Sequence, residues 1–250
     1  MANKEVIFGI RTVQEAVIKG EDIDKVLISS SLKGEGFNEL LNDLRKHKVP
    51  FQFVPIQKID HISKKNHQGV IAYSSPITLH QFEDIVQNVY ENGEIPLIII
   101  LDNITDIRNF GAIARTAECA GVHTIIIPEK GSARISADAI KASAGALFNI
   151  PVCRVQKLKQ TIEALKSSGI QIVATTEKAD NNYYDIDLTI PTAIIMGSEE
   201  KGIRDEIIDM SDYCAKIPIS GQIKSLNVSV ATAILTYEAV KQRRVIDLDV

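Results

Sequence analysis

A series of short, uninterrupted apolar runs most constrains the fold of this chain. Helical patterns separate the runs from one another, and turn residues bound each of them. The runs lie at residues 97–101, 124–127, 170–175, 193–196 and 214–219, with a further candidate at 152–155. Strands that are covered on both faces of a sheet have this continuous Ile, Val and Leu composition. The pattern therefore predicts an α/β fold in which helices cover both faces of a parallel sheet.

The first part of the chain shows a second, smaller α/β pattern. Short β-like runs alternate there with helical periodicity. The runs lie at residues 25–29, 51–54 and 70–73, and the helical patterns lie at 11–19 and 37–48.

We expect these patterns to divide the chain into three regions. Residues 1–75 form a small α/β domain, residues 76–95 form a linker, and residues 96–250 form the larger domain. The boundary is placed at residues 95–96, where a polar stretch gives way to the first apolar run. Residues 243–247 are expected to be a frayed C-terminal tail.

The composition excludes several classes of protein. With 45% hydrophobic and 24% charged residues, the chain is typical of a folded globular protein. No apolar run is long enough to cross a bilayer, and no targeting segment is expected at the N-terminus. The three cysteines are far apart, which argues against a disulfide framework and against a metal site. We therefore expect a cytoplasmic protein that binds neither metal nor membrane.

Charge alone does not identify a partner. The net charge is −4, but residues 1–75 carry 11 basic and 9 acidic side chains, which gives that region a charge of +2. Such a small difference is explained as well by chance variation as by an RNA-binding surface.

Three polar segments follow predicted strands, where the N-termini of helices meet in an α/β sheet. They cover residues 102–111, 196–203 and 217–227. Helix capping explains either Ser225 or Asn227 but does not readily explain both. Arg115, on the helix after the first segment, is either a surface ion-pair partner or a cation directed into a site. Glu199 and Glu200 do not form a catalytic carboxylate pair, because adjacent residues at a helix start do not face one another.

Common nucleotide-binding and nucleophile motifs are missing from the sequence. There is no Gly-x-Gly-x-x-Gly after a strand, no Walker-type Gly-Lys-Ser/Thr and no Gly-x-Ser-x-Gly. Dinucleotide enzymes, P-loop NTPases and α/β-hydrolases are correspondingly disfavoured.

In order and spacing, segments 101–117, 196–202 and 217–231 resemble the three signature motifs of the SpoU (TrmH-type) RNA ribose 2′-O-methyltransferases. Residues 8–16 and 67–70 resemble the L30e-like substrate-binding domain of bacterial large-subunit rRNA guanosine-2′-O-methyltransferases. The resemblance implies a SPOUT-type parallel sheet with a C-terminal trefoil knot, preceded by a small L30e-like α/β domain. It also implies a homodimer that uses S-adenosyl-L-methionine.

The resemblance also assigns roles to individual residues. The cofactor would contact Gly197, Ile217 and Leu226, and Arg115 would act on the 2′-hydroxyl, with Asn109, Glu199, Ser225 and Asn227 as the other catalytic positions. The expected RNA contacts are Arg11, Lys64, Lys65 and His67, although a solvated charged face explains each Lys equally well. The chain departs from the family at Ile107, where proline is usual, and at Glu200, where glycine is common.

The function that follows from the resemblance is methyl transfer from S-adenosylmethionine to a ribose 2′-hydroxyl, on a guanosine of large-subunit (23S) rRNA. The first alternative is a tRNA or a resistance-type rRNA methyltransferase of the same family. The second is a non-catalytic RNA-binding or ribosome-assembly protein with this fold. A small-molecule enzyme with an unrelated cofactor ranks third.

Overall fold

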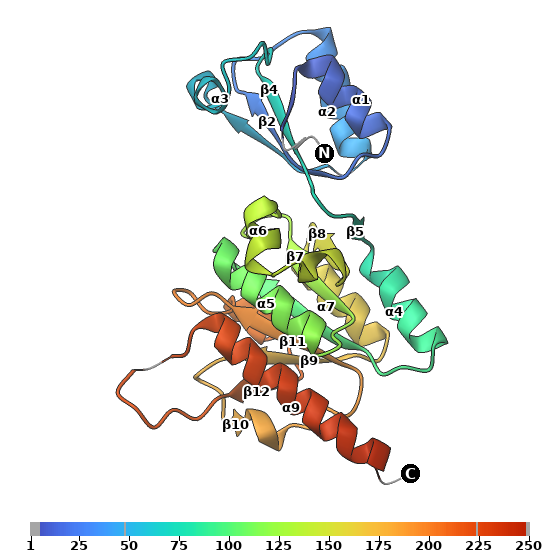
Figure 1. Cartoon of the computed structure of the whole chain (residues 1–250), viewed down its shortest axis with the longest axis vertical. Helices are drawn as coiled ribbons and strands as arrows, with labels where there is room; N and C mark the ends of the chain where they lie inside the picture. Colours follow the sequence, from blue (N-terminus) through green and yellow to red (C-terminus); the bar gives the residue numbers. More distant parts are fainter. Residues whose placement is uncertain (1–5, 48, 224, 249–250) are drawn as a thin grey trace. The chain divides into compact units, whose positions relative to one another are not determined.

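The computed structural model describes residues 6–47, 49–223 and 225–248. Contacts between residues divide the chain into two compact units, Met1–Thr78 and Leu79–Val250 (Figure 1). Each unit has its own sheet and its own buried apolar core.

The first unit is a four-stranded mixed sheet with helices on both faces. Its strands are β1 (Val6–Phe8), β2 (Ile23–Ser29), β3 (Phe51–Val54) and β4 (Val70–Ser74), in the order β1-β4-β2-β3. Strands β1 and β2 are antiparallel to β4, and β3 is parallel to β2. Helices α1 (Ile10–Ile18) and α2 (Glu35–Lys46) pack on one face, and α3 (Ile56–Ile62) packs on the other. The L30e-like character of this unit stays a prediction.

The second unit is built on an eight-stranded sheet in which every pair of neighbouring strands is parallel. The order is β10-β12-β9-β11-β6-β7-β8-β5. The strands are β5 (Leu79–His80), β6 (Leu97–Asp102), β7 (Thr124–Pro128), β8 (Val152–Val155), β9 (Gln171–Thr175), β10 (Asn181–Asn182), β11 (Thr192–Gly197) and β12 (Tyr213–Lys216). The predicted parallel sheet is confirmed, whereas the trefoil knot stays a prediction.

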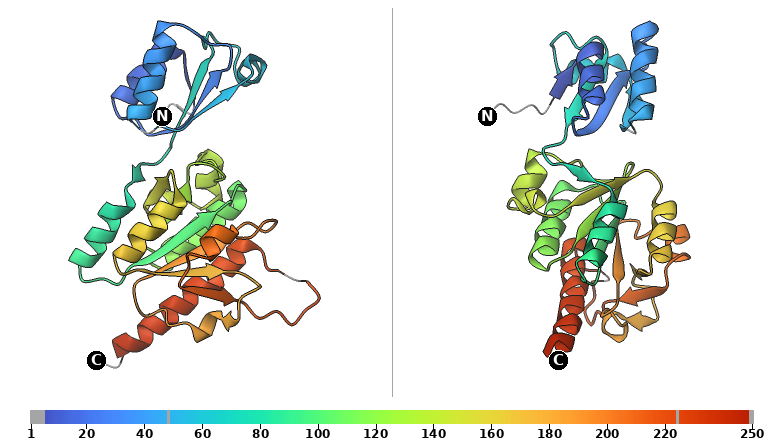
Figure 2. Two further views of the ribbon diagram at one scale, coloured as in Figure 1. Left: turned by 180° about the vertical axis from the view of Figure 1, so that it is seen from behind. Right: turned by 90° about the vertical axis from the view of Figure 1, so that its right-hand side faces the viewer.

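Helices cover both faces of this sheet, which explains why its central strands are apolar throughout. The α-helices are α4 (Phe82–Glu91), α5 (Ile107–Cys119), α6 (Ala137–Ala142), α7 (Leu158–Ser167), α8 (Asp205–Ile208) and α9 (Val228–Leu248), and 3-10 turns lie at Ala146–Phe148 and Tyr183–Asp185. Side chains of α4, α7 and α8 share a buried cluster with Ile98, Ile100 and Ile195. Helices α5 and α9 contact each other on the opposite face (Figure 2).

Residues 76–95 differ from the expected linker. Strand β5 extends the large sheet by pairing with β8, and α4 buries Phe82 and Val86 in the core of the second unit. The apolar positions of α4 recur every three or four residues, so the helix has a buried stripe within a polar sequence. This periodicity outweighs the polar composition on which the linker prediction depended.

Residues 243–247 also differ from the expected frayed tail, since α9 continues to Leu248. The guanidinium of Arg243 donates hydrogen bonds to four main-chain carbonyls. They belong to Leu188 at 3.0 Å, Ile95 at 2.7 Å, Pro96 at 3.0 Å and Ile190 at 3.0 Å. Burial lowers the pKa of Arg243 to about 10, so the side chain remains charged at neutral pH. Through these hydrogen bonds, Arg243 holds the C-terminal part of α9 against the segments that lead into β6 and β11.

The described residues contain neither a candidate membrane span nor a candidate metal cluster. No helix among them combines the length and the apolar character that a bilayer span requires. No three His, Cys, Asp or Glu side chains in that part of the chain gather closely enough to hold a metal ion.

Candidate active site

The loops after four neighbouring parallel strands, β12, β9, β11 and β6, meet at one edge of the large sheet. Strands β6 and β11 stay in register to their last residues, where Gly197 lies opposite Asp102. The first two motif segments therefore begin side by side, although they are far apart in the sequence.

A cavity of about 440 Å³ lies among the loops that follow β9, β11 and β12. Gly197, Ile217 and Leu226, the three residues expected to contact the cofactor, all line this first cavity, as do Glu199 and Ser225. Small-molecule sites commonly have volumes of about 300–1,000 Å³. The first cavity is therefore large enough for an organic cofactor.

The segment from 198 to 204, which we call the β11 loop, folds tightly back on the end of its strand. A Cβ atom on Gly197 would lie 2.2 Å from the carbonyl carbon of Gly202 and 2.3 Å from the nitrogen of Ile203. The nitrogen of Gly202 donates to the oxygen of Ser198 at 2.8 Å, and Gly202 has a φ of +66°. Only glycine leaves room at position 197, which explains one of the two glycines in this motif.

Side chains from all three motif segments meet beside the cavity. Oε1 of Glu199 accepts hydrogen bonds from Nδ2 of Asn109 at 3.1 Å and from Nδ2 of Asn227 at 2.6 Å. The same Asn227 nitrogen lies 2.9 Å from Oδ1 of Asn109. The main-chain nitrogen of Val228 also donates to Glu199, at 3.3 Å. We call Asn109, Glu199 and Asn227 the amide–carboxylate cluster.

Helix caps position both asparagines of the cluster. Asp106 is the N-cap of α5, and its carboxylate accepts a hydrogen bond from the nitrogen of Asn109 at 2.8 Å. Asn227 precedes α9, and its Oδ1 accepts from the nitrogen of Ser229 at 3.0 Å. Capping therefore explains Asn227, and its amide nitrogen remains available to bind Glu199.

A second cavity, of about 290 Å³, adjoins the first on the side of α5. Asn109 and Glu199 of the cluster line it. It is lined by Asn103, Thr105 and Asn109, and it shares residues 198–201 and Val228 with the first cavity. Glu199 thus lies in the wall between the two cavities. This arrangement suits a reaction between two ligands that bind next to each other.

Comparison with protein families agrees with this geometry. The model described as the SpoU rRNA Methylase family matches residues 96–237, and the model described as RNA 2′-O ribose methyltransferase substrate binding matches residues 6–79. The chain belongs to the SpoU rRNA methylase family. It is therefore an RNA methyltransferase of the SpoU type, a family whose methyl donor is S-adenosylmethionine.

Individual SpoU proteins resemble the chain over most of its length. A Staphylococcus saprophyticus protein, provisionally named a TrmH family tRNA/rRNA methyltransferase, is 37% identical over 96% of this chain and 97% of its own. The SpoU methyltransferase AviRb from Streptomyces viridochromogenes, solved in complex with AdoMet, is 26% identical, with a TM-score of 0.61 over 96% of this chain and 90% of its own. The TrmH/SpoU tRNA modifying enzyme of A. aeolicus is 33% identical, with a TM-score of 0.57 over 66% of this chain and 85% of its own.

Arg115, the residue expected to act on the hydroxyl in this SpoU protein, lies apart from the cluster. It follows Asn109 by six residues on α5, its side chain is exposed, and it lines neither cavity. Arg115 makes no hydrogen bond or ion pair with any other described residue. A single chain therefore shows Arg115 neither as an ion-pair partner nor as a cation directed into the site.

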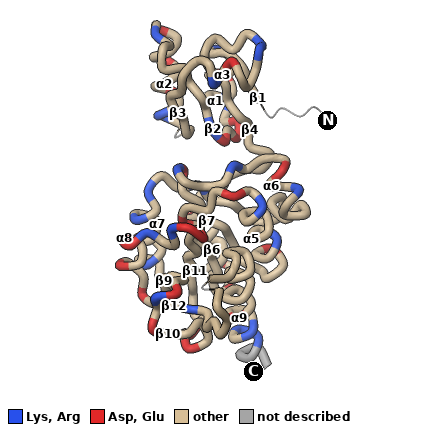
Figure 3. The backbone as a smooth tube through the Cα atoms, turned by 90° about the vertical axis from the view of Figure 1, so that its left-hand side faces the viewer, with Lys and Arg blue, Asp and Glu red and all other residues tan. Residues whose placement is uncertain are grey.

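Ser225 and the expected RNA contacts have different surroundings. Ser225 is exposed on the wall of the first cavity. In the first unit, Arg11 and Lys64 are exposed, and Nζ of Lys65 lies 5.3 Å from the ring centre of Phe8. Arg11, Lys64 and Lys65 lie at the end of the first unit's sheet where β1 ends and β4 begins. Basic and acidic residues are interspersed along the backbone of both units (Figure 3).

His67 contributes mainly to the structure of its own loop. Its Nδ1 accepts from the nitrogen of Gly69 at 3.0 Å, so its Nε2 carries the proton that is donated to Asp60, also at 3.0 Å. The ring is only 11% exposed. Its expected RNA contact stays a prediction, and the side chain also orders the segment that carries Lys64 and Lys65.

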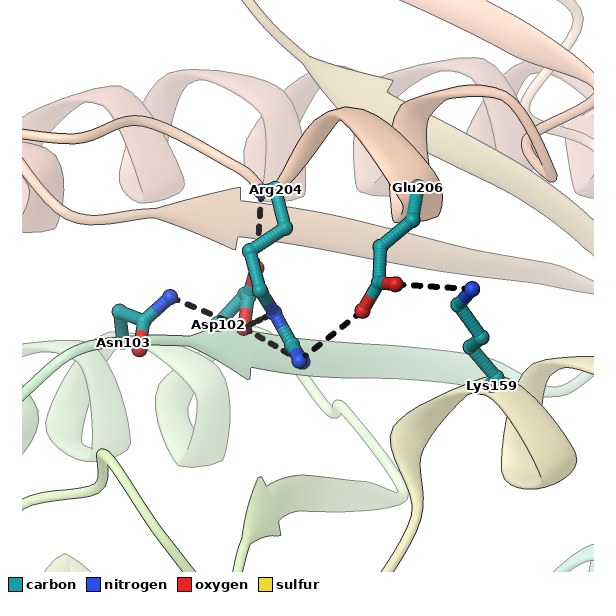
Figure 4. A network of polar contacts seen from close by, with 5 residues as sticks. All are labelled: Asp102, Asn103, Lys159, Arg204 and Glu206. Atoms are coloured by element: carbon teal, nitrogen blue, oxygen red, sulfur yellow. Dashed lines mark hydrogen bonds and ion pairs between the residues drawn. The ribbon is translucent and has the colours of Figure 1, made fainter.

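Sequence analysis did not single out Arg204, and it included Asp102 only as the first residue of the polar segment 102–111. Asp106 is the cap, whereas Asp102 is fully buried and bonded to Arg204 (Figure 4). Arg204 also contacts Glu206 at 3.2 Å, and Lys159 lies 2.8 Å from Glu206. The hydrogen bond from Lys159 lowers the pKa of the Glu206 carboxyl. The available signal was an aspartate at the end of an otherwise apolar strand, since a buried carboxylate requires a partner.

Proposed function

We propose that this protein transfers a methyl group from S-adenosylmethionine to the ribose 2′-hydroxyl of a guanosine in 23S rRNA. The observation that carries the proposal is the amide–carboxylate cluster, which joins all three motif segments between two adjacent cavities. One cavity suits the cofactor and the other suits the target nucleotide.

The residues of the first cavity fit S-adenosylmethionine. Met196, Ile217 and Leu226 offer apolar contacts, and the tight turn at Gly197 brings main-chain groups to the cavity wall. When bound, the cofactor supplies a methyl group that its sulfonium has already activated. The chain must then align the sugar oxygen and assist the loss of its proton.

We assign Arg115 to stabilise the negative charge that develops on that oxygen. A guanidinium keeps its proton in proteins, so it is a poor base but an effective electrostatic partner for an alkoxide. Glu199, Asn109, Ser225 and Asn227 orient the nucleotide by hydrogen bonds.

A homodimer would bring Arg115 to the site of the other subunit. The exposure of Arg115 and its separation from both cavities support this arrangement. Helix α9, which packs against α5, exposes Val230 and Tyr237 seven residues apart on one helix face. Such apolar side chains are suited to a subunit interface.

The experiment that tests this function is transfer of labelled methyl groups to purified 23S rRNA and, separately, to tRNA. We expect label in 23S rRNA, and mapping of the product should locate it on a ribose 2′-oxygen of guanosine. Label in tRNA alone would favour the tRNA alternative, which the A. aeolicus tRNA modifying enzyme supports. RNA binding without transfer to either substrate would instead indicate a non-catalytic RNA-binding protein.

The first unit is assigned RNA capture, and the double variant Lys64→Gln, Lys65→Gln tests this role. We expect the variant to bind RNA more weakly. A plot of the logarithm of the binding constant against the logarithm of the salt concentration should also be less steep, by about 1 for each phosphate that the variant no longer binds. Binding of S-adenosylmethionine, measured by calorimetry, should not change.

The matched control is the double variant Arg45→Gln, Lys46→Gln, which neutralises two exposed charges at the end of α2. This end of α2 is remote from the loop after β1 and from the loop before β4. Equal RNA affinity and salt slopes for the two double variants would contradict the assigned RNA surface.

A further inference from the structure

An ion pair between the buried carboxylate of Asp102 and the side chain of Arg204, which is 43% exposed, joins the end of β6 to the end of the β11 loop. It lies outside both cavities. Nε of Arg204 lies 3.0 and 3.1 Å from the two carboxylate oxygens of Asp102, and Nη2 lies 3.0 Å from Oδ1. The main-chain nitrogen of Arg204 also donates to Oδ2 of Asp102, at 3.0 Å. One carboxylate therefore fixes both the side chain and the backbone of Arg204 (Figure 4). We call Asp102 and Arg204 the buried pair, after the buried carboxylate of Asp102.

The buried pair closes the β11 loop at its far end. The near end is fixed by the register of β11 on β6, in which Gly197 lies opposite Asp102. The same residue of β6 thus meets the loop at both of its ends. Between these two points the loop presents Glu199 and lines both cavities. Neither Asp102 nor Arg204 lines either of these two cavities, so the pair can act on a ligand bound there only through the loop.

The two carboxylates that bind Arg204 differ greatly in burial. The side chain of Asp102 is 1% exposed, whereas that of Glu206 is 46% exposed. A buried carboxylate that loses its cation is strongly destabilised, whereas an exposed ion pair contributes little. Asp102 therefore holds Arg204 in place, and Glu206 is a peripheral contact.

We infer that the buried pair consists of positioning residues that hold the β11 loop in its cofactor-binding conformation. This inference rests on the proposed function, because it takes S-adenosylmethionine as the ligand of the first cavity. When only a fraction of the molecules have a competent loop, the apparent dissociation constant rises by the inverse of that fraction. The pair acts on affinity, because saturating cofactor selects the molecules in which the loop is competent and Glu199 is in place in the cluster.

The test is Arg204→Gln, with the dissociation constant for S-adenosylmethionine measured by calorimetry on the full-length protein. We expect that constant to rise about tenfold, as it would if the competent loop fell to about a tenth of the molecules. The KM for the cofactor should rise in parallel, and kcat at saturating cofactor should be retained. Arg204→Lys keeps the charge but lacks the forked geometry, so its constant should lie between those of Arg204→Gln and wild type.

Glu206→Gln is the matched control, because it removes the exposed contact of the same guanidinium. The dissociation constant of this variant for S-adenosylmethionine should remain within about twofold of wild type. Circular dichroism establishes that each variant is folded. A folded Arg204→Gln protein with wild-type affinity would overturn the inference, as would a lower melting temperature without a change in affinity. If wild-type protein binds no S-adenosylmethionine, the proposed function fails instead.

Discussion

Replacing Arg115 with alanine is expected to reduce methyl transfer about a thousandfold, because the variant loses the cation assigned to the developing alkoxide. The dissociation constant for S-adenosylmethionine should remain within about twofold of wild type, since Arg115 lines neither cavity. Single-turnover transfer of labelled methyl groups and calorimetry measure the two quantities. Wild-type turnover by Arg115→Ala would remove the residue from the mechanism.

A mixing experiment tests whether Arg115 acts in the other subunit. Neither Arg115→Ala nor Glu199→Ala protein should be active alone. In an equal mixture of a two-fold dimer, half of the dimers are mixed, and each has one site with both residues intact. Activity should therefore recover to about a quarter of wild type. If the mixture stays inactive, Arg115 acts within its own chain.

Arg108→Ala provides the matched control for both experiments. Arg108 is an exposed arginine seven residues before Arg115 on α5, so it lies on the same side of the helix. It resembles Arg115 in charge and exposure but has no assigned role at the sugar oxygen. A loss as large as that of Arg115→Ala would point to a general effect of positive charge on α5.

The sequence predicts the central sheet well because burial on both faces leaves an unmistakable composition. The run at β6 is an example, since all six of its residues are buried. Strands β1, β5 and β10 were not predicted, because segments of two or three residues are too short to show a period. Local patterns thus locate the strands that fill the core but not the short strands at the edges of the sheets.

Contacts between distant segments were the least predictable. The buried pair joins residues 102 positions apart, and Arg243 reaches a carbonyl 148 positions away. Neither contact leaves a local signal beyond a charged residue in an unexpected place. The amide–carboxylate cluster was anticipated only through the family resemblance, because spacing alone indicated helix caps at these loops.

Among single substitutions of charged residues on α9, Arg243→Gln is expected to lower the free energy of unfolding most. Four main-chain carbonyls lose their charged donor, at the segments that lead into β6 and β11. Because these carbonyls are only partly shielded from water, we expect a loss of about 2–4 kcal/mol in the free energy of unfolding. For a protein of this size, each kcal/mol lowers the melting temperature by about 2–4 °C.

Arg244→Gln is the adjacent control, because its exposed side chain should change the free energy of unfolding by no more than about 0.5 kcal/mol. Urea titration followed by circular dichroism compares the two variants. Arg243→Lys should fall between wild type and Arg243→Gln, since one ammonium cannot span four carbonyls. Equal stability of the Arg243→Gln and Arg244→Gln proteins would show that α9 is held by its apolar contacts alone. A selective loss would establish that the charged end of α9 secures the two strands whose opposite ends build the site.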